Sequence, residues 1–303
     1  MAPPTTDAVR ERAQAPWTIG RLLDWTAKYL QEKGSEFPRL DAEVLLAHAL
    51  GCKRIEVYTR YEEEAPEDVR QRFKELVRRR VEGCPVAYLV GRKEFYSLEF
   101  EVGPAVLIPR PDTETLVLEA LRLARPLAAP EVLDVGTGSG AIAVAVAVRH
   151  QGARVTAIDI SPEASAVAGR NAARHGVADR VRLLQGDLFA PLGPAVASGR
   201  FDLVLSNPPY IPREELPRLE PGVRDYEPLG ALDGGPGGFE VYDRLVRGAR
   251  ERLKPGGHLV VEIGSPQEAE ARRRLEACGG YEVGPTVKDG SGHPRVLVAR
   301  WPG

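Results

Sequence analysis

The sequence predicts an α/β fold in which a mostly parallel β-sheet carries helices on both faces, preceded by a small helical domain and a β-hairpin. Three observations predict it. The first part of the chain shows helical periodicity without a convincing strand, short β-prone runs follow over residues 94–108, and strands then alternate with helices. Alternating β and α units place a parallel sheet between layers of helices. We expect a helical domain over 1–88, a hairpin linker over 89–111 and an α/β domain over 112–303.

The composition fits a folded protein without a strong global charge. Of the 303 residues, 43% are hydrophobic, which suffices for a sizeable core. The 41 basic and 43 acidic side chains give a net charge of −2, so no global field draws the chain to nucleic acid. Direct binding of nucleic acid is therefore not expected.

The cysteines and the apolar runs bear on location and on metals. Cys52, Cys84 and Cys278 are widely spaced and accompany no C-x-x-C motif or histidine cluster, so we predict neither a disulfide framework nor a metal site. The polar, proline-rich start lacks the apolar core of a signal peptide, and the longest apolar run, Ala141–Val148, is too short for a bilayer. We expect a cytoplasmic protein with no membrane segment.

The helical domain is expected to hold three amphipathic helices. Each begins at a residue that suits a helix start and ends at a glycine, which suits a helix end. The expected limits are Thr18 and Gly34 for the first helix, Pro38 and Gly51 for the second, and Pro66 and Gly83 for the third.

The α/β domain is expected to alternate six strands with four main helices. Ligands of such sheets lie beyond the carboxyl ends of the strands, so the residues that follow each strand are the candidates for function. The predicted strands are Glu131–Val135, Arg154–Asp159, Val181–Gln185, Phe201–Ser206, His258–Ile263 and Val296–Arg300. The predicted helices are Asp112–Leu123, Ala141–Arg149, Pro162–His175 and Phe239–Leu253.

A glycine-rich segment, Asp134–Gly140, follows the first strand and opens the next helix. Glycines allow a tight turn there and let the backbone approach a ligand closely. Gly136, Gly138 and Ala141 also match the G-x-G-x-x-A pattern of dinucleotide binders. We predict that a cofactor binds this loop, through Gly136, Thr137, Gly138, Ser139 and Gly140.

Acidic residues end the next two strands. Asp159 lies 23 residues after Gly136, the spacing at which an acid accepts hydrogen bonds from ribose hydroxyls. Asp187 is placed to accept from an adenine amino group, with Leu188 against the ring, although a purely structural role is about equally consistent with the sequence. These residues indicate a bound adenosine and leave open whether it belongs to NAD or to S-adenosylmethionine.

The fourth strand ends in Ser206–Tyr210, a run with two consecutive prolines. The prolines remove two backbone donors and stiffen the loop, so that carbonyl groups are presented outward. The side-chain carbonyl of Asn207 and the main-chain carbonyl of Pro208 form two fixed acceptors, which suit a planar NH2 group with two donors. With Pro209, the ring of Tyr210 offers a surface for a flat amide or base.

This pair of acceptors indicates methyl transfer to a planar nitrogen and favours S-adenosylmethionine as the cofactor. Such a nitrogen is a poor nucleophile because its lone pair is delocalised. Acceptors for both N–H groups align the nitrogen with a sulfonium methyl and stabilise the positive charge that develops. The mechanism requires no metal and no evident general base. The motif does not distinguish an adenine from a glutamine amide.

At this point the chain resembles the HemK/PrmC family, the protein-(glutamine-N5) methyltransferases of peptide-chain release factors. The resemblance covers nearly the whole sequence. The shared segments are Asp41–His48, Gly91–Tyr96, Leu107–Glu114, the glycine loop, Asn207–Tyr210, Tyr226–Pro228, Ala231–Gly235 and Glu262–Gly264. The segment 288–295 is looser than the family pattern, which leaves the details of the last strand open.

The resemblance implies a class I (Rossmann-like) S-adenosylmethionine-dependent methyltransferase fold whose last strand runs antiparallel. It implies that the glycine loop, Asp159 and Leu188 contact the cofactor. Asn207–Tyr210 would hold the glutamine of the release factor's Gly-Gly-Gln loop, and Leu107 would form an apolar wall beside it. The helical domain would recognise the rest of the factor.

Three other functions are weighed against this one. An adenine-N6 methyltransferase acting on DNA or RNA meets the same chemical problem, but it should carry a basic, partly aromatic domain that reads the target. The helical domain is instead acidic at Glu62–Glu64. An NAD-dependent oxidoreductase would leave Asn207–Tyr210 unexplained, and a non-catalytic binding module would need no fixed pair of acceptors.

Overall fold

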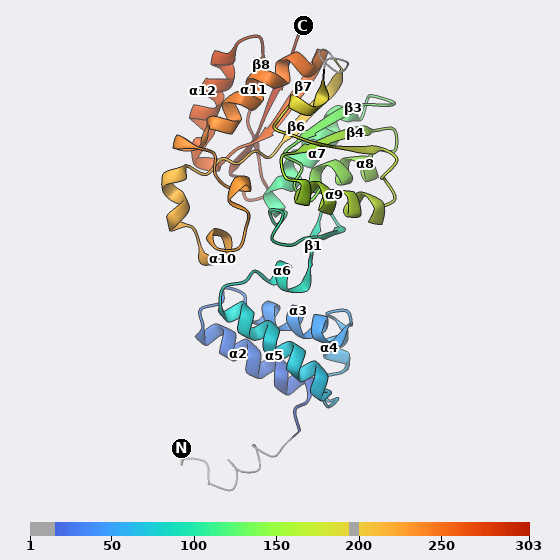
Figure 1. The fold of residues 1–303 in the computed structure, drawn as a ribbon, viewed down its shortest axis with the longest axis vertical. Coiled ribbons are helices and arrows are strands. Elements are labelled where there is room, and N and C mark those ends of the chain that lie inside the picture. Colours follow the sequence, from blue (N-terminus) through green and yellow to red (C-terminus); the bar gives the residue numbers. More distant parts are fainter. Residues whose placement is uncertain (1–15, 194–199) are drawn as a thin grey trace. The chain divides into compact units, whose positions relative to one another are not determined.

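The computed structural model describes residues 16–193 and 200–303 and divides after Val90 into two compact units (Figure 1). Residues 1–15 of the expected helical domain lie outside the described residues. The boundary falls within the expected linker 89–111, whose first two residues belong to the helical unit.

The helical unit contains the three predicted helices. Thr18 caps the first of them by accepting a hydrogen bond from the backbone N–H of Arg21, at 3.2 Å. Gly51 ends the second in the left-handed conformation, with φ of 65°. Two short helices were not predicted, because four or five residues are too few to show a helical period. The helices are α2 (Ile19–Glu32), α3 (Pro38–Leu50), α4 (Glu56–Thr59), α5 (Glu67–Val81) and α6 (Val86–Val90).

The second unit begins with the predicted hairpin, formed by β1 (Arg92–Phe95) and β2 (Leu98–Glu101). Asn171, which is fully buried on a later helix, ties the hairpin to the rest of this unit. Its side-chain oxygen accepts from the Glu101 N–H at 2.7 Å, and its amide group donates to the carbonyls of Glu101 at 3.0 Å and Ser139 at 2.9 Å. The hairpin is therefore a packed part of the α/β unit.

The main sheet has eight strands within the described residues, in the order β5-β4-β3-β6-β7-β10-β8, with β9 paired to β10. The strands from β5 to β7 are parallel, and β10 runs antiparallel to β7, as the resemblance implied. The strands are β3 (Glu131–Val135), β4 (Arg154–Asp159), β5 (Val181–Gln185), β6 (Phe201–Ser206), β7 (Leu253–Glu262), β8 (Glu282–Val283), β9 (Val287–Lys288) and β10 (Pro294–Arg300).

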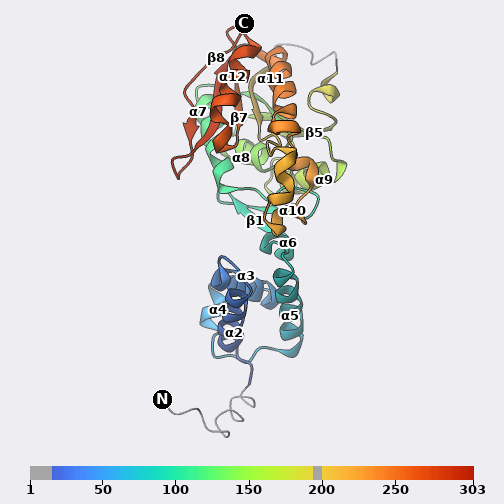
Figure 2. The ribbon, with the colours of Figure 1, turned by 90° about the vertical axis from the view of Figure 1, so that its left-hand side faces the viewer.

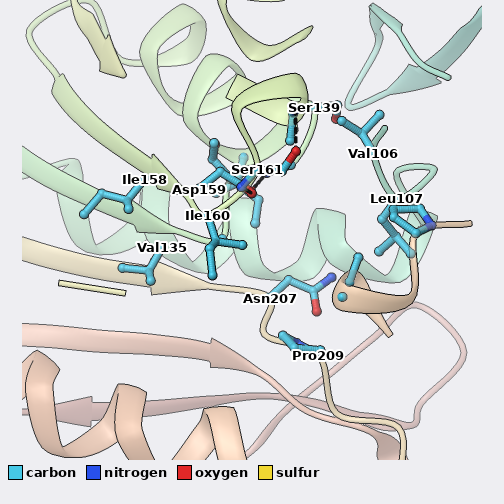
Figure 3. A pocket seen from close by; sticks show the side chains of 18 of the residues that line it. Val106, Leu107, Val135, Ser139, Ile158, Asp159, Ile160, Ser161, Asn207 and Pro209 are labelled. Atoms are coloured by element: carbon cyan, nitrogen blue, oxygen red, sulfur yellow. Dashed lines mark hydrogen bonds between the residues drawn. The ribbon is translucent and has the colours of Figure 1, made fainter. Parts of the chain in front are cut away.

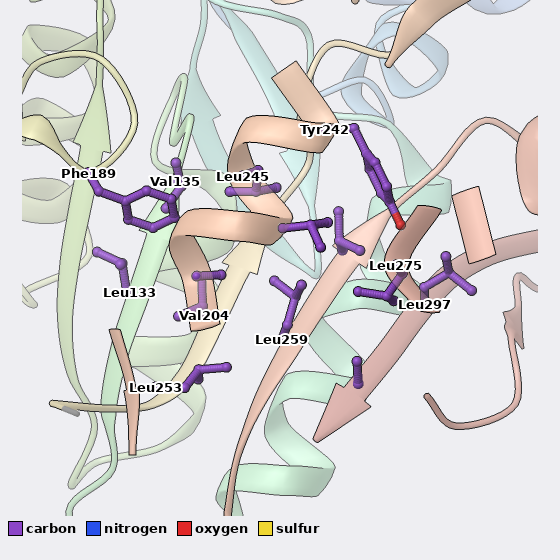
Figure 4. Close-up of a cluster of buried hydrophobic side chains, with 14 of the residues drawn as sticks. Leu133, Val135, Phe189, Val204, Tyr242, Leu245, Leu253, Leu259, Leu275 and Leu297 are labelled. Carbon is purple, nitrogen blue, oxygen red and sulfur yellow. The ribbon is translucent and has the colours of Figure 1, made fainter. Parts of the chain in front are cut away.

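Alternate side chains of the strands build a core on each face of the sheet. Leu133, Val204, Leu259 and Ala299 are partners in register on four neighbouring strands, and all four are buried in one hydrophobic cluster. Leu245 of the overlying helix joins them (Figure 4). This row of side chains fixes the register of the sheet, because a slip by one residue would turn each of them to the opposite face.

Helices cover both faces of the sheet, as predicted. On one face α7, α8 and α9 pack successively against one another, and on the other α11 and α12 lie side by side in both views (Figures 1 and 2). These helices and one short additional helix are α7 (Glu114–Ala124), α8 (Ala141–Arg149), α9 (Pro162–Arg174), α10 (Pro221–Arg224), α11 (Glu240–Arg252) and α12 (Glu268–Cys278). Among the described residues, no helix combines the length and apolar character that crossing a membrane requires.

The predicted limits of β3, β4, β5, β6 and α8 agree with the structure. The differences lie elsewhere: β7 starts at Leu253, five residues before the predicted His258, and α12 was not predicted. The segment that departs from the family pattern forms a turn after β9. The carboxylate of Asp289 holds this turn by accepting from the backbone N–H groups of Ser291 and His293 at 3.0 Å each.

Candidate active site

The residues that follow β3, β4, β5 and β6 meet at one cavity of about 660 Å³ at the carboxyl edge of the sheet (Figure 3). Strand β3 lies between β4 and β6, so the order of the strands reverses there, which is where open α/β sheets bind ligands. The cavity brings together most of the residues predicted from the sequence. Those that line it are Leu107, Gly136, Thr137, Gly138, Ser139, Asp159, Asp187, Leu188, Asn207 and Pro209.

Three predicted residues, Gly140, Pro208 and Tyr210, do not line the cavity. Gly140 precedes α8 with φ of 79°. Pro208 is buried in the loop. The carbonyl of Tyr210 accepts a hydrogen bond from Gln267 Nε2 at 2.8 Å. Burial and, to a smaller extent, the nearby Glu262 carboxyl raise the pKa of the Tyr210 phenol to about 12, so the phenol is neutral at physiological pH.

The glycine loop turns tightly because its backbone donors face the neighbouring strand. The N–H groups of Gly136 and Thr137 both donate to the carbonyl of Ile158, at 2.8 and 3.0 Å. Gly136 and Gly138 have φ of 74° and 57°, and no atom lies within 4 Å of the position that a Cβ would take on either. A side chain there would be strained and would stand in open space, so glycine leaves the backbone accessible to a ligand.

Asp159 ends β4 with both carboxylate oxygens directed at backbone donors. Oδ2 accepts from the Gly138 N–H at 2.8 Å and Oδ1 accepts from the Ser161 N–H at 2.9 Å. Each oxygen of a carboxylate has a second lone pair, which is free for a ligand hydroxyl. The exposed side chain of Ile160 lies beside it and adds an apolar surface (Figure 3). Asp159 thus shapes the glycine loop, and its contact with ribose hydroxyls stays a prediction.

Asp187 lines the cavity, and so does its ion-pair partner, Arg244. The guanidinium of Arg244 binds one carboxylate oxygen, Oδ2. No pattern in the sequence indicates this partner, which lies on α11. Leu188, next along the chain, has a positive φ of 48°.

A buried carboxyl beneath the glycine loop was not assigned a role from the sequence. Asp134 is fully buried at the end of β3, and the Thr137 hydroxyl donates to its Oδ2 at 2.6 Å. Burial raises the pKa of Asp134 to about 7, with a smaller contribution from the Asp159 charge. This bond fixes the side chain of Thr137. Asp134 and Asp159 thus each hold the glycine loop, Asp134 through Thr137 and Asp159 through the N–H of Gly138.

The side-chain nitrogen of Asn207 is bonded within the protein, whereas its side-chain oxygen is available to a ligand. Its Nδ2 donates to the hydroxyl of Thr113 at 3.2 Å, and Thr113 lies in the 3₁₀ turn Pro111–Thr113 before α7. No hydrogen bond to its Oδ1 is found among the described residues, so this oxygen can accept from a ligand. The preceding Ser206 donates its hydroxyl to the Val135 carbonyl at 2.7 Å, which joins the ends of β6 and β3.

Leu107 lines the cavity (Figure 3), and Glu227 holds the segment that carries it. Glu227 is buried, and its carboxylate accepts from the Ile108 N–H at 3.1 Å and from the guanidinium of Arg110. Pro228, next to Glu227, also lines the cavity. One carboxylate therefore connects two walls of the site. From the sequence, Glu227 was included only in a shared segment, without a role.

The groups that line the cavity fit a nucleoside. Asp159 supplies acceptors for ribose hydroxyls, Ile160 and Leu188 supply apolar surface for a flat base, and the open glycine backbone allows close approach. Within residues 16–193 and 200–303, no group of three His, Cys, Asp or Glu side chains is arranged to hold a metal ion.

The chain is similar to known proteins over most of its length. The chain matches the family model of the PrmC N-terminal domain over residues 21–91 and a methyltransferase domain model over residues 132–223. The release factor glutamine methyltransferase of Rhodopirellula baltica is 50% identical, over 93% of this chain and 96% of its own length. That of Geobacter sulfurreducens is 47% identical, over 94% of this chain and 97% of its own length.

Among solved structures, the hMettl16 catalytic domain in complex with the MAT2A 3'UTR hairpin 6 is similar, with a TM-score of 0.52. The match covers 75% of this chain and 81% of that one at 16% sequence identity, a level that supports a shared fold only.

Proposed function

The chain belongs to the family of release factor glutamine methyltransferases, and from this membership we infer that it methylates a glutamine side chain of peptide-chain release factors. Its methyl donor is S-adenosyl-L-methionine, and its second unit has the class I methyltransferase fold. We propose further that the methylated glutamine is that of the Gly-Gly-Gln loop and that the acceptor atom is its side-chain amide nitrogen, N5. One observation carries this proposal: Asn207 lines the same cavity as the glycine loop, and its Oδ1 has no hydrogen bond within the part of the chain that the structure describes.

The cavity residues divide between the cofactor and the substrate. When bound, S-adenosylmethionine supplies a methyl group made electrophilic by its sulfonium centre. Asp159 would bind the ribose hydroxyls, Leu188 and Ile160 would lie against the adenine, and Asp187 would accept from the adenine amino group with its second oxygen. The remaining contacts would come from the glycine loop, through Gly136, Thr137, Gly138, Ser139 and Gly140.

The substrate amide would be held by acceptors on the stiff loop after β6. Asn207 Oδ1 would accept from one N–H of the glutamine amide. The Pro208 carbonyl would accept from the other after a rearrangement of the loop, since Pro208 does not line the cavity in this structure. The two bonds orient the amide nitrogen toward the methyl group and stabilise the positive charge that forms on it. The methylated nitrogen is strongly acidic, so its proton leaves to water without a dedicated base.

Two further contacts would exclude water from the substrate. Leu107 would cover one side of the glutamine as an apolar wall, with Pro209 opposite. Tyr210, whose phenol is neutral, would offer its ring to the amide after a rearrangement of the loop, since it does not line the cavity in this structure. The helical unit would recognise the body of the release factor, and a cytoplasmic location stays a prediction.

The test is mass spectrometry of a purified release factor incubated with the protein and S-adenosylmethionine. We expect the mass of one methyl group, located by fragmentation on the glutamine of the Gly-Gly-Gln loop. A factor with that glutamine replaced by asparagine is the matched control and should gain no methyl group. Methylation at another glutamine would refute the assignment of the loop. Methylation of an adenine-containing oligonucleotide, with none on the factor, would favour the adenine-N6 alternative.

A further inference from the structure

We propose that Thr113 and Glu262 are positioning residues that fix the carboxamide of Asn207 with its oxygen toward the substrate. The inference rests on the proposed function, because it concerns the orientation that a glutamine amide requires. Thr113 lines the cavity and Glu262 does not, and we assign both residues a role that acts through Asn207.

The problem arises because the two ends of a carboxamide have nearly the same shape and opposite hydrogen-bonding character. The oxygen accepts, and the NH2 group donates. If Asn207 turned over, its NH2 group would face the NH2 group of the glutamine, and neither could accept from the other. An isolated asparagine has no strong preference between the two orientations, so a neighbouring group must select one.

Thr113 makes this selection in the structure. Its hydroxyl is buried and accepts from Asn207 Nδ2 at 3.2 Å. A hydroxyl can also donate its single proton, and in that case it would bind the oxygen of a turned-over Asn207 equally well. The selection therefore depends on where the Thr113 proton points.

We assign Glu262 as the acceptor toward which that proton points. It lies at the end of β7 with 1% of its surface exposed, and the Thr113 hydroxyl acts on its carboxyl as a hydrogen-bond donor that lowers the pKa. With its proton directed to Glu262, Thr113 offers only lone pairs to Asn207, and only the NH2 end of the carboxamide fits. The chain of bonds from Glu262 through Thr113 to Asn207 leaves Oδ1 for the substrate.

Glu262 has no evident stabilising role that would explain its burial. Its Oε2 is buried and lacks a hydrogen-bond partner among the described residues. Burial raises the pKa of its carboxyl to about 7, although the Thr113 hydroxyl and the charges of Arg295 and Arg110 act in the opposite direction, and Asp112 raises it. An apolar residue of similar size would avoid this cost, which points to a functional reason for the acid.

The orientation of Asn207 can be measured without any substrate, because the chain contains only two asparagines, Asn171 and Asn207. Side-chain ¹⁵N labelling of asparagine therefore gives two NH2 signals, which Asn207→Ala assigns. The amide protons of Asn171 are bonded to the carbonyls of Glu101 and Ser139 and report on the integrity of the fold.

In the wild type, we expect one Asn207 amide proton to exchange more slowly with solvent than the other. Thr113→Val should reduce this protection by about fivefold, the equivalent of one neutral hydrogen bond, while Thr113→Ser should keep it. Glu262→Met, which removes the acceptor for the Thr113 proton, should reduce it as well, and Glu262→Gln should retain most of it. The Asn171 signals should stay unchanged in all four variants. Unchanged Asn207 protection in Thr113→Val or in Glu262→Met would overturn the inference.

Turnover of a release factor gives the second measurement. Thr113→Val should lower kcat by about tenfold with an unchanged Kd for S-adenosylmethionine, and Thr113→Ser should restore it. In the Asn207→Ala background, Thr113→Val should change kcat by less than about twofold, because the group on which it acts is gone. An equal loss in both backgrounds would assign Thr113 a role independent of Asn207. If the wild type methylated no release factor, the proposed function would fail, and the exchange measurement would still decide the inference.

Discussion

Replacing Asp159 with alanine is expected to weaken the binding of S-adenosylmethionine by about two orders of magnitude. In the structure, each carboxylate oxygen accepts one backbone N–H, from Gly138 or Ser161, and keeps a lone pair for a ribose hydroxyl. A hydrogen bond to a charged group contributes about 1.5–3 kcal/mol. Two such bonds at the lower end of this range, suited to a half-buried site, give about 3 kcal/mol, or a Kd increase of about 150-fold.

Asp159→Asn separates the two contributions. Its side-chain oxygen can still accept from one ribose hydroxyl, while its NH2 group faces a backbone N–H or a hydroxyl. We expect an intermediate loss of about 1.5 kcal/mol, or roughly tenfold in Kd. Glu163→Gln is the matched control, since Glu163 also lines the cavity and carries the same charge.

Isothermal titration calorimetry with S-adenosylmethionine measures all three variants. A general effect of charge on the cationic ligand would appear in Glu163→Gln and Asp159→Asn alike, whereas direct contact predicts a loss of less than about twofold for Glu163→Gln. A Kd for Asp159→Ala within about twofold of the wild-type value would refute the ribose contacts and leave Asp159 as a residue that shapes the glycine loop.

Three other outcomes are expected. Asn207→Ala should lower kcat by roughly 10²-fold or more with an unchanged Kd for S-adenosylmethionine, and nearly intact turnover would contradict the mechanism of paired acceptors. Glu227→Gln weakens the hold on the segment of Leu107, so it should raise KM for the release factor about tenfold in steady-state assays; an unchanged KM would separate that wall from substrate binding. Because the pKa of Glu262 rises from 4.5 to about 7 in the folded protein, the folded state keeps a proton that the unfolded state has lost, and stability falls as the pH rises through this window. Between about pH 4.5 and pH 8, the free energy of unfolding of Glu262→Gln should fall by about 3 kcal/mol less than that of the wild type, as measured by urea unfolding. If Glu262 is not the group that titrates, the variant and the wild type will show the same fall.

Sequence reasoning found the parts of the site that follow strands directly. The glycine loop, Asp159 and Asn207 each stand at the end of a strand that the sequence predicts with the observed limits. In a parallel sheet, the position along the chain then fixes the position in space, because every such end meets the same edge.

The groups that support the site could not be found in this way. Thr113 lies 94 residues before Asn207, and Ile108 lies 119 residues before Glu227, so no local pattern connects the partners. The same holds for Arg244, which binds Asp187 from 57 residues away. Each of these pairs depends on the packing of whole elements, such as α7 against the end of β6 and β7, and that packing is set by the core.

The position of the hairpin could not be predicted from the sequence either. The sequence between 89 and 111 has short β-prone runs and suggests a connection between two domains. The hairpin is attached to the α/β unit by polar residues of α9: Asn171 bonds to the backbone of Glu101, and Arg170 and Arg174 form ion pairs with the hairpin. A buried asparagine with its bonds satisfied looks the same in a sequence as an exposed one.

Three buried acids at the carboxyl edge of the sheet share one physical explanation. Asp134, Glu227 and Glu262 are all buried. Burying an acid lowers stability, and folded proteins avoid this unless the charge is paired or used. Each also holds one part of the site: Asp134 holds Thr137 of the glycine loop, Glu227 holds the segment of Leu107, and Glu262 holds Thr113. The transfer of a methyl group to a weakly nucleophilic amide depends on fixed groups rather than on an acid or base. By holding the parts of the site in place, these three carboxyls therefore favour the reaction. Substituting any one of them should therefore lower activity more than stability.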